Sequence, residues 1–541
     1  MPLLGFQALI LCGPGASLST FTTNPEEFPK ALIPIANRPM IWYPLDWCYR
    51  MGVSDITLIT PVSSTKAIEA ALSQNPHLTS LPSPKADVLA PEGLDYTNNT
   101  AEILRLPEVR SAITGDFIVL PCDLVCELAG ESLIEAWMVK QAGLDKISGV
   151  HSHRYAHDES SGQLHGRRGG LGVYFDTKGE GTTKHEETDF LITAPVAGSR
   201  DPTTEGSLVP NVQELVYSTT KDTLEDIKEE NKSFPLRHAL ADRHPRTKIL
   251  TTYRDAHIYI FPYWVLNMIK RNPEMESISE DVLGWWIKAR WQKGFAAKLG
   301  LEKVLRPRRP SKPEDDIQSV ESELNLAPIS TNSTTDQLDR QDESQSIVSK
   351  PTQSILVPPF LAYIQPKAAT LPLIRRVDTV QLLLYVSLRL AKLDSIQDIG
   401  KAVASPFAHN SKVAYPAGLA AKTTINQADC LIAENTTVES KSIIKESVIG
   451  ANCTIKSGVK LTRCVLMDGV VVGERCELTG CIIGRRAQIG QFSVLVDCQV
   501  QEGNIIPEKT DAKGQNFMVF EGLEVSDEDE DDTRTSMAED T

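Results

Sequence analysis

Two features of the N-terminal half have the residue types needed to bind a ligand. The loop 13–15, Gly-Pro-Gly, follows the apolar run 8–12. Glycine lets backbone N–H groups approach an anion closely, so this loop could cradle a phosphate. Asp123 follows a second apolar run, 117–120, which places it at the carboxyl end of a predicted strand. Open α/β sheets bind ligands at that edge, so we expect a site there.

The elements that position these residues are those of an α/β domain. Residues 1 to about 300 alternate aliphatic runs with helical patterns, which predicts a mostly parallel sheet with helices on it. After a first strand at 7–12, apolar residues recur at helical spacing between Pro39 and Gly52. This face consists of Met40, Tyr43, Pro44, Trp47, Cys48 and Met51. Further strands are expected at 56–60 and 117–120.

A different pattern begins at residue 427. Aliphatic residues recur every six positions, with one five-residue step in each seventeen-residue cycle. This spacing is typical of a solenoid with triangular coils, each face of which is a short strand that points its aliphatic side chain inward. The fourteen positions that fit are Ile432, Val438, Ile444, Ile449, Ile455, Leu461, Leu466, Val472, Leu478, Ile483, Ile489, Leu495, Val500 and Ile506.

The same cycle aligns several cysteines. Cys464, Cys481 and Cys498 are seventeen residues apart, and Cys430 lies two cycles before Cys464. The ladder could be a metal or redox site, but it has no CxxC spacing and no histidine nearby, so we interpret it as a column of small buried side chains. The pair Cys122 and Cys126, which flanks Asp123, is interpreted in the same way.

Composition sets the broad class of protein. The 541 residues carry a net charge of −16, which argues against a protein that binds polyanions without sequence preference. Ten cysteines without dense or paired spacing are typical of a reducing compartment, so we expect a cytosolic protein. The charge-free stretches are too short and too polar for a transmembrane helix.

One run of residues resembles the signature of a known enzyme family and so indicates a specific chemistry. The run Phe28-Pro29-Lys30-Ala31-Leu32, followed by 34–41, resembles the N-terminal signature of the sugar-nucleotide pyrophosphorylases. The resemblance implies that Gly13, Gly15 and Lys30 correspond to the loop that holds a nucleoside triphosphate. It also implies that Asp123 corresponds to the aspartate that binds magnesium. Cations are needed there because a sugar phosphate attacks a second phosphate group.

The chain departs from that signature at two places. Ala16-Ser17-Leu18 stands where the family has Thr-Arg-Leu, and serine cannot replace the charge-assisted contact of an arginine with phosphate. Asn99 stands where the family has a glycine against the base. We therefore expect a retained fold with lost catalysis: no catalytic residue, no cofactor, a vestigial nucleotide loop at Gly13, Gly15 and Lys30, and a vestigial metal aspartate at Asp123.

The order of the two predicted domains and four further motifs indicate one family among the proteins that combine such domains. Motifs at 234–237, 255–259, 277–281 and 376–381 resemble the gamma-subunit family of eukaryotic translation initiation factor 2B. The resemblance implies a non-catalytic subunit of the complex that replaces GDP by GTP on initiation factor 2. Its partners would be the catalytic epsilon subunit, the alpha, beta and delta subunits, and initiation factor 2 as substrate, with no membrane or direct nucleic-acid contact. The alternative is an active GDP-mannose-type pyrophosphorylase.

The expected architecture is a Rossmann-like nucleotidyltransferase domain followed by a left-handed parallel β-helix of hexapeptide repeats. The segments are an α/β domain at 1–304, a disordered linker or insertion at 305–354, a connecting strand and helix segment at 355–426, the β-helix at 427–507 and an acidic tail at 508–541.

Overall fold

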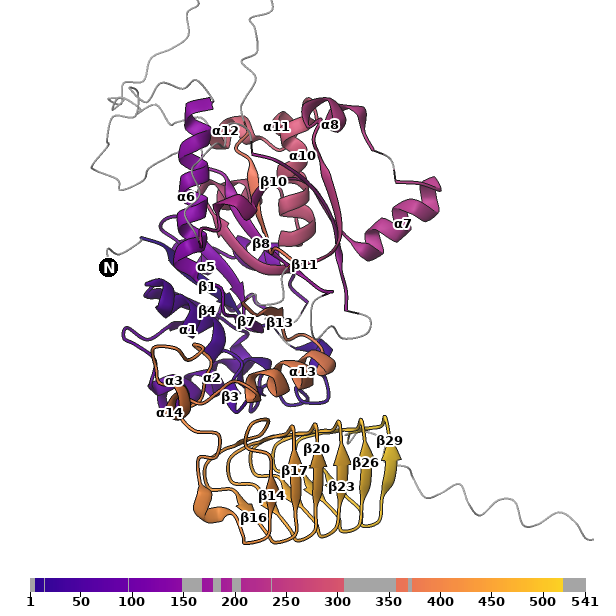
Figure 1. The fold of residues 1–541 in the computed structure, drawn as a ribbon. Helices are drawn as coiled ribbons and strands as arrows, with labels where there is room; N and C mark the ends of the chain where they lie inside the picture. Colours follow the sequence, from indigo (N-terminus) through magenta and orange to yellow (C-terminus); the bar gives the residue numbers. More distant parts are fainter. Residues whose placement is uncertain are drawn as a thin grey trace, which may run out of the picture.

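The computed structural model places an α/β domain on one side of a triangular β-helix (Figure 1). It describes residues 5–13, 15–95, 97–147, 168–178, 186–196, 206–234, 236–305, 357–367 and 372–518, with side chains of the helix at 130–147 described only to residue 141. Residues 306–354 of the predicted linker and 519–541 of the predicted tail lie outside these ranges. In the described part of the chain, no helix is long and apolar enough to cross a bilayer.

The first half of the central sheet is parallel, as the sequence predicts. Its strands lie in the order β5-β4-β1-β6, and they are β1 (Gln7–Leu11), β4 (Asp55–Ile59), β5 (Asp87–Leu89) and β6 (Phe117–Pro121). The predicted first helix is α1 (Trp42–Met51), and Gly52 ends it with φ 83°, a left-handed conformation that suits glycine. It begins later than predicted, because Arg38–Pro39 forms the short strand β3, paired with β2 (Pro34–Ile35).

The second half of the sheet makes it mixed, so the prediction of a mostly parallel sheet is wrong there. The strand β11 (Lys248–Phe261) runs antiparallel to both β6 and β8 (Gly170–Asp176). Strands β9 (Asp189–Ala194) and β10 (Val212–Thr220) form an antiparallel pair at the far edge. The strand β12 (Phe360–Ile364) comes from the predicted connecting segment and lies in the sheet between β8 and β10.

Helices cover both faces of this sheet, which gives three layers. Along β6, Ile118 and Leu120 face one hydrophobic cluster, whereas Phe117 and Val119 face the other. On the first face lie α1, α2 (Val62–Gln74), α3 (Pro76–Thr79), α6 (Gly130–Ile147) and α13 (Val380–Ala391). On the second lie α4 (Thr100–Arg105), α5 (Pro107–Ala112), α9 (Trp264–Arg271), α10 (Leu283–Trp291), α11 (Phe295–Lys298) and α12 (Leu301–Leu305). Helix α7 (Lys221–Asn231) follows β10 and extends outward, and α8 (His238–Arg243) lies beside α10 (Figure 1).

The C-terminal part is a parallel β-helix with three sheets, which confirms the prediction from the seventeen-residue cycle. All fourteen inward positions are at most 2% exposed. One sheet contains β14 (Thr424–Ile425), β17 (Ile443–Lys445), β20 (Lys460–Thr462), β23 (Glu477–Thr479), β26 (Val494–Val496) and β29 (Asp511–Lys513). The second contains β15 (Leu431–Ile432), β18 (Val448–Ile449), β21 (Val465–Leu466), β24 (Ile482–Ile483), β27 (Gln499–Val500) and β30 (Asn516–Phe517). The third contains β16 (Thr437–Val438), β19 (Thr454–Ile455), β22 (Val471–Val472), β25 (Gln488–Ile489) and β28 (Ile505–Ile506). These strands extend beyond both ends of the range 427–507.

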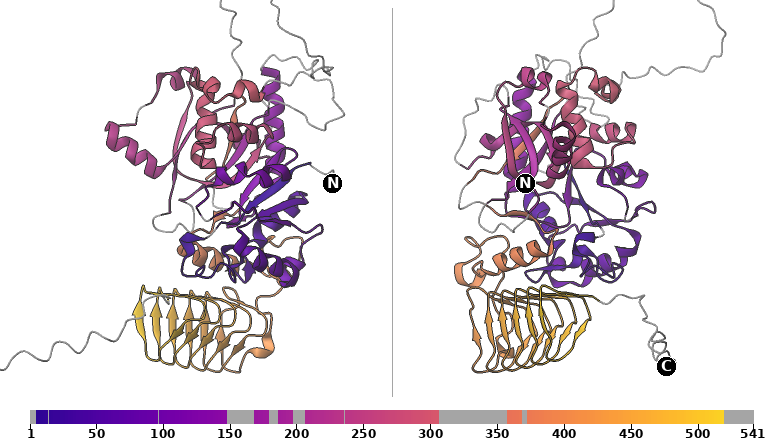
Figure 2. Two further views of the ribbon diagram at one scale, coloured as in Figure 1. Left: turned by 180° about the vertical axis from the view of Figure 1, so that it is seen from behind. Right: turned by 90° about the vertical axis from the view of Figure 1, so that its right-hand side faces the viewer.

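The β-helix packs directly against the α/β domain (Figure 2). Leu431, Val448, Val465 and Ile482 on the second sheet belong to the same hydrophobic cluster as helix α1. Polar contacts add to this junction. The Thr20 hydroxyl donates to Gln499 at 3.1 Å, and the Arg485 guanidinium lies 4.2 Å from the ring centre of Phe28. The β-helix therefore holds the segment that follows the glycine loop.

Candidate functional site

A cleft lies at the carboxyl ends of β1 and β6, where the sequence predicts the site. Its inner cavity has a volume of about 230 Å³, and Gly13, Lys30 and Asp123 all line it. An outer cavity of about 580 Å³ shares His257, Ser279 and Arg376 with the inner one. Three of the four residues predicted from the sequence therefore come together around one space, and Gly15 has a different place.

Gly15 supports Lys30 instead of lining the cavity. Its φ of 79° lies in the left-handed region, and a Cβ atom there would be only 2.8 Å from Cβ of Lys30. Only glycine fits this position without strain or displacement. The next three residues, Ala16–Leu18, form a single 3-10 turn with no basic side chain. The predicted loss of a phosphate-facing cation therefore leaves this turn without a positive charge.

Lys30 and Asp123 form a buried ion pair. Nζ of Lys30 donates to Oδ2 of Asp123 at 2.6 Å, with residue exposures of 9% and 2%. Burial alone would raise the pKa of Asp123, but the positive charges of Lys30 and Arg376 outweigh it and hold this pKa below its ordinary value. Burial alone would lower the pKa of Lys30, but the charge of Asp123 raises it overall. Both side chains are therefore charged at neutral pH.

A second cation, Arg376, approaches Asp123 from a segment that is distant in the sequence. The strand β13 (Ile374–Arg376) pairs with β7 (Leu124–Cys126), and the backbone N–H of Val377 donates to the carbonyl oxygen of Asp123 at 2.8 Å. This pairing places Nε of Arg376 3.5 Å from Oδ1 of Asp123. The sequence pointed to the segment 376–381 only through the resemblance, and nothing local in it indicates this contact.

His257 completes the inner site as a neutral ring. A break in the register of β11 between Asp255 and Tyr259 contains His257, whose φ is 53°. Its Nε2 lies 3.1 Å from Nη1 of Arg376, and because a guanidinium can only donate, Nε2 accepts. Burial, followed by the charge of Arg376, lowers the pKa of His257 well below its usual value. The imidazole therefore adds no positive charge to the cleft.

Asp255 and Asp189 form a pair of carboxyl groups that line the outer cavity. Oδ1 and Oδ2 of Asp255 accept from the N–H of His257 and the hydroxyl of Tyr259, at 2.8 and 2.6 Å. The N–H of Asp255 donates to Oδ2 of Asp189 at 2.6 Å. Burial, followed by the charge of Asp189, raises the pKa of Asp255 to about 7. Burial raises the pKa of Asp189 to about 6.

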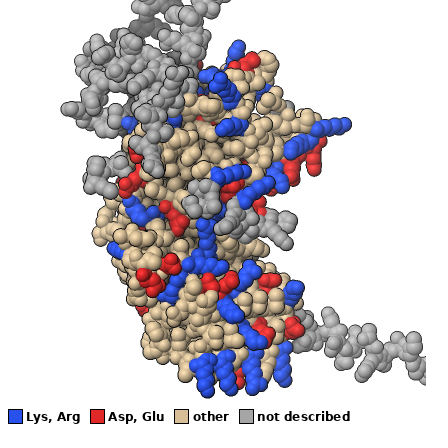
Figure 3. All heavy atoms as spheres, in the orientation of Figure 1, with Lys and Arg blue, Asp and Glu red and all other residues tan. Residues whose placement is uncertain are grey.

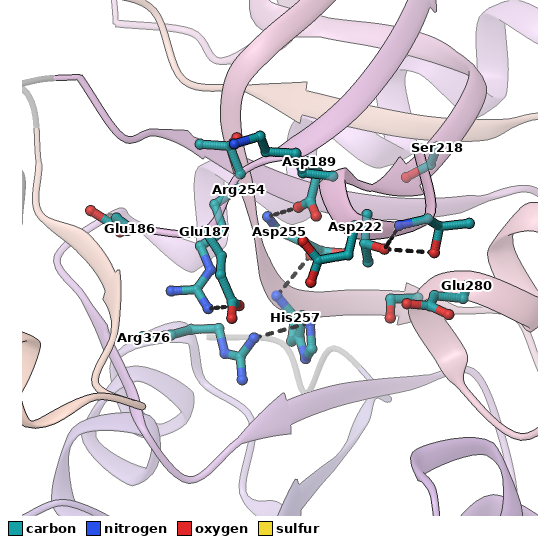
Figure 4. Close-up of a pocket in the computed structure, with 15 residues that line it drawn as sticks. Glu186, Glu187, Asp189, Ser218, Asp222, Arg254, Asp255, His257, Glu280 and Arg376 are labelled. Carbon is teal, nitrogen blue, oxygen red and sulfur yellow. Dashed lines mark hydrogen bonds and ion pairs between the residues drawn. The ribbon is translucent and has the colours of Figure 1, made fainter. Parts of the chain in front are cut away.

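The outer cavity is rich in carboxylates (Figure 4). Its acidic residues are Glu186, Glu187, Asp189, Asp222, Asp255 and Glu280. Its basic side chains are Lys221, Arg254 and Arg376, and Arg254 already contacts Asp378 at 2.7 Å and Glu187 at 3.0 Å. Within the described ranges, no three His, Cys, Asp or Glu side chains are grouped so that they could hold a metal ion. The carboxylates of this cavity would repel a phosphate.

Charge on the molecular surface is mixed. Figure 3 shows Lys and Arg side chains along the edge of the β-helix farthest from the α/β domain, with Asp and Glu among them. Exposed Lys441, Arg475 and Lys509 occupy equivalent corner positions in this β-helix, at φ of 64°, 54° and 60°. Acidic residues, Glu474 and Glu508, are adjacent in the sequence to two of these three basic corner residues.

Comparison with known proteins bears on both domains. Residues 413–516 match the family model described as "EIF2B subunit epsilon LbH domain", which agrees with the predicted left-handed β-helix. The chain is also 26% identical over 324 residues to "Translation initiation factor eIF2B subunit gamma" of Schizosaccharomyces pombe (strain 972 / ATCC 24843). That alignment spans 59% of this chain and 59% of the relative. The fold and these two matches together support an eIF2B gamma-like protein.

Proposed function

We propose that the chain is a non-catalytic subunit of an eIF2B complex that replaces GDP by GTP on translation initiation factor 2. It pairs with the catalytic epsilon subunit, supports its activity in the cytosol, and assembles with the alpha, beta and delta subunits. The resemblance to eIF2B gamma supports the complex. The observation that carries the non-catalytic role is the ion pair that Asp123 makes with the chain's own Lys30.

A working pyrophosphorylase needs the opposite arrangement. Its aspartate must be free to hold magnesium, and its lysine must be free to meet phosphate charge. Here Lys30 and Asp123 neutralise each other, and Arg376 adds a second cation next to Asp123. A divalent cation at Asp123 would be repelled by the positive charges of Lys30 and Arg376 and would have to displace both side chains. The carboxylates of the outer cavity would further repel a sugar phosphate.

The β-helix offers surfaces for the partner subunits. The final coil strands β28 and β29 each pair on one side only among the described residues, with β25 and β26. Apolar side chains are exposed nearby: Phe492 at 43%, Val494 at 37% and Ile505 at 66%. Free strand edges with apolar neighbours are features that subunit contacts cover. They support a role in assembly.

The proposal is tested by nucleotide exchange. Release of fluorescent GDP from initiation factor 2 is measured with the epsilon-type subunit of the same cell, alone and after co-expression with this chain. We expect the co-expressed pair to exchange faster than the epsilon-type subunit alone, and this chain alone to give no exchange. Exchange by the epsilon-type subunit that is unchanged by the chain would contradict the proposal.

A second candidate, the GDP-mannose-type pyrophosphorylase, is favoured by one observation. Lys30 and Asp123 are both retained and still meet at the carboxyl ends of β1 and β6. This enzyme would release pyrophosphate from a sugar phosphate and a nucleoside triphosphate in the presence of magnesium. We expect no release above a blank reaction, and turnover that is lost in Asp123→Asn would restore this candidate.

A further inference from the structure

Two cysteines on the floor of the cleft have no part in the proposed function. Cys12 directly follows β1 and Cys122 directly follows β6. The last residues of these parallel strands, Leu11 and Pro121, are register partners, and the N–H of Cys122 donates to the carbonyl oxygen of Leu11 at 3.1 Å. The two cysteines therefore lie side by side on neighbouring strands, where Cα atoms are close enough for a disulfide bond.

Both thiols can be reached by a small molecule. Cys12 and Cys122 line the inner cavity of about 230 Å³, together with Gly13, Lys30 and Asp123. A cavity of this volume has room for a peroxide, which is little larger than water. Neither cysteine is in a disulfide in the structure. The cavity thus joins two reduced thiols to a space that an oxidant can enter.

The two thiols face the same space. Cys12 is 6% exposed and Cys122 is 2% exposed, and both line the inner cavity. An oxidant in this cavity can therefore meet either thiol, and the neighbouring thiol then resolves the product.

We propose that Cys12 and Cys122 form a redox-active pair that hydrogen peroxide oxidises to a disulfide through the inner cavity. In the first step, the sulfur of one of the two cysteines attacks one peroxide oxygen, the O–O bond breaks, and that cysteine becomes a sulfenic acid with release of water. In the second step, the sulfur of the other cysteine attacks the sulfenic sulfur, the S–O bond breaks, and a second water leaves. The peroxide is reduced and the two thiols are oxidised to one disulfide.

The disulfide would change the cleft. It joins the ends of the two strands that carry Gly13 and Asp123. Its formation therefore constrains Gly13 against Asp123 and reduces the space in the inner cavity. The proposal is independent of the role in nucleotide exchange, because it depends only on the α/β domain.

The β-helix provides an internal control. Cys464 and Cys481 also lie side by side on parallel strands, because Val465 and Ile482, which follow them, are register partners. Each influences the pKa of the other. Both are 0% exposed, however, and they line neither cavity of the cleft. Access, rather than pairing, distinguishes the two pairs.

The test is a hydrogen peroxide titration of the full chain, followed by peptide mapping without reduction. We expect a Cys12–Cys122 crosslink, with loss of two hydrogen atoms, at a peroxide concentration at least about tenfold below that which modifies Cys464 or Cys481. Cys12→Ser and Cys122→Ser should each prevent the crosslink, and the remaining thiol should give a sulfenic acid that dimedone traps. Oxidation of the β-helix pair at the same concentration, or no crosslink before the protein unfolds, would overturn the proposal. The wild-type map decides the question even if a variant fails to fold.

Discussion

Replacing Lys30 by methionine tests whether the buried ion pair holds the vestigial site together. Lys30→Met keeps the length of the side chain but leaves the carboxylate of Asp123 at 2% exposure without its partner at 2.6 Å. Removing one member of a buried pair costs about 3–5 kcal/mol. Because Arg376 remains 3.5 Å from Oδ1 of Asp123, we expect the lower end, about 3 kcal/mol of the free energy of unfolding.

The assay is chemical unfolding followed by tryptophan fluorescence. All 7 tryptophans lie between residues 42 and 291, so the signal reports the α/β domain and not the β-helix. Lys298→Met is the matched control, since Lys298 is exposed at the end of α11 and its replacement should stay within about 0.5 kcal/mol. The double variant Lys30→Met/Asp123→Leu should recover most of the loss, because it removes both charges.

The pH dependence of this loss adds a second criterion. The pKa of Asp123 is lowered in the folded state, so its contribution to stability is present above the pKa of the unfolded chain and is lost as the pH falls. The difference between wild type and Lys30→Met should therefore shrink below about pH 4. A free energy of unfolding for Lys30→Met within about 1 kcal/mol of the wild-type value at pH 7 would refute the reasoning, because loss of the partner of a buried carboxylate should cost more than that.

Three further outcomes follow from the structure. Asp255 keeps its proton up to about pH 7 when folded, so the folded state binds more protons than the unfolded state between about pH 4 and 7. The free energy of unfolding therefore falls as the pH rises through that range, by at most about 1.4 kcal/mol per pH unit. Asp255→Asn should flatten this slope in unfolding curves measured across the range. Gly473→Ala should destabilise the β-helix by about 2 kcal/mol or more in thermal circular dichroism, because the new Cβ would lie 2.8 Å from the backbone N of Gln491. The control is Gly503→Ala, which has open space around it and φ +69° and should cost only about 1 kcal/mol of backbone strain. Equal losses would contradict the close approach of the coils. Millimolar magnesium should leave the melting temperature of the wild-type chain unchanged, and a rise with magnesium concentration would show that Asp123 still binds the ion.

The sequence predicts the β-helix well because burial alone sets its pattern. Each inward position, such as Ile455 or Leu478, must be aliphatic, so the period can be read directly. The strand β12 could not be placed in this way. Phe360 to Ile364 is an ordinary apolar run, and its position between β8 and β10 depends on partners more than a hundred residues away. Local sequence carries no record of such pairings.

The positions of Gly13 and Asp123 after strand ends could be predicted from the sequence, but the contacts around them could not. The glycine loop and Asp123 follow strands whose ends can be predicted from the sequence, whereas Lys30 was identified only by the resemblance. That Lys30 would bind Asp123 depends on three-dimensional distance, and so does the approach of Arg376 from β13. His257 was also missed as a site residue. Its left-handed conformation lies within a register shift of β11, and residues 256–258 include no glycine or other turn residue that would indicate the shift.

The most direct test of the central claim is quantitative mass spectrometry of the proteins that co-purify with a tagged copy of this chain from its own cells. The proposed function predicts stoichiometric recovery of an epsilon-type partner and the alpha, beta and delta subunits, with initiation factor 2 in smaller amount. Recovery of the chain only with itself would contradict a role as a subunit of the exchange complex.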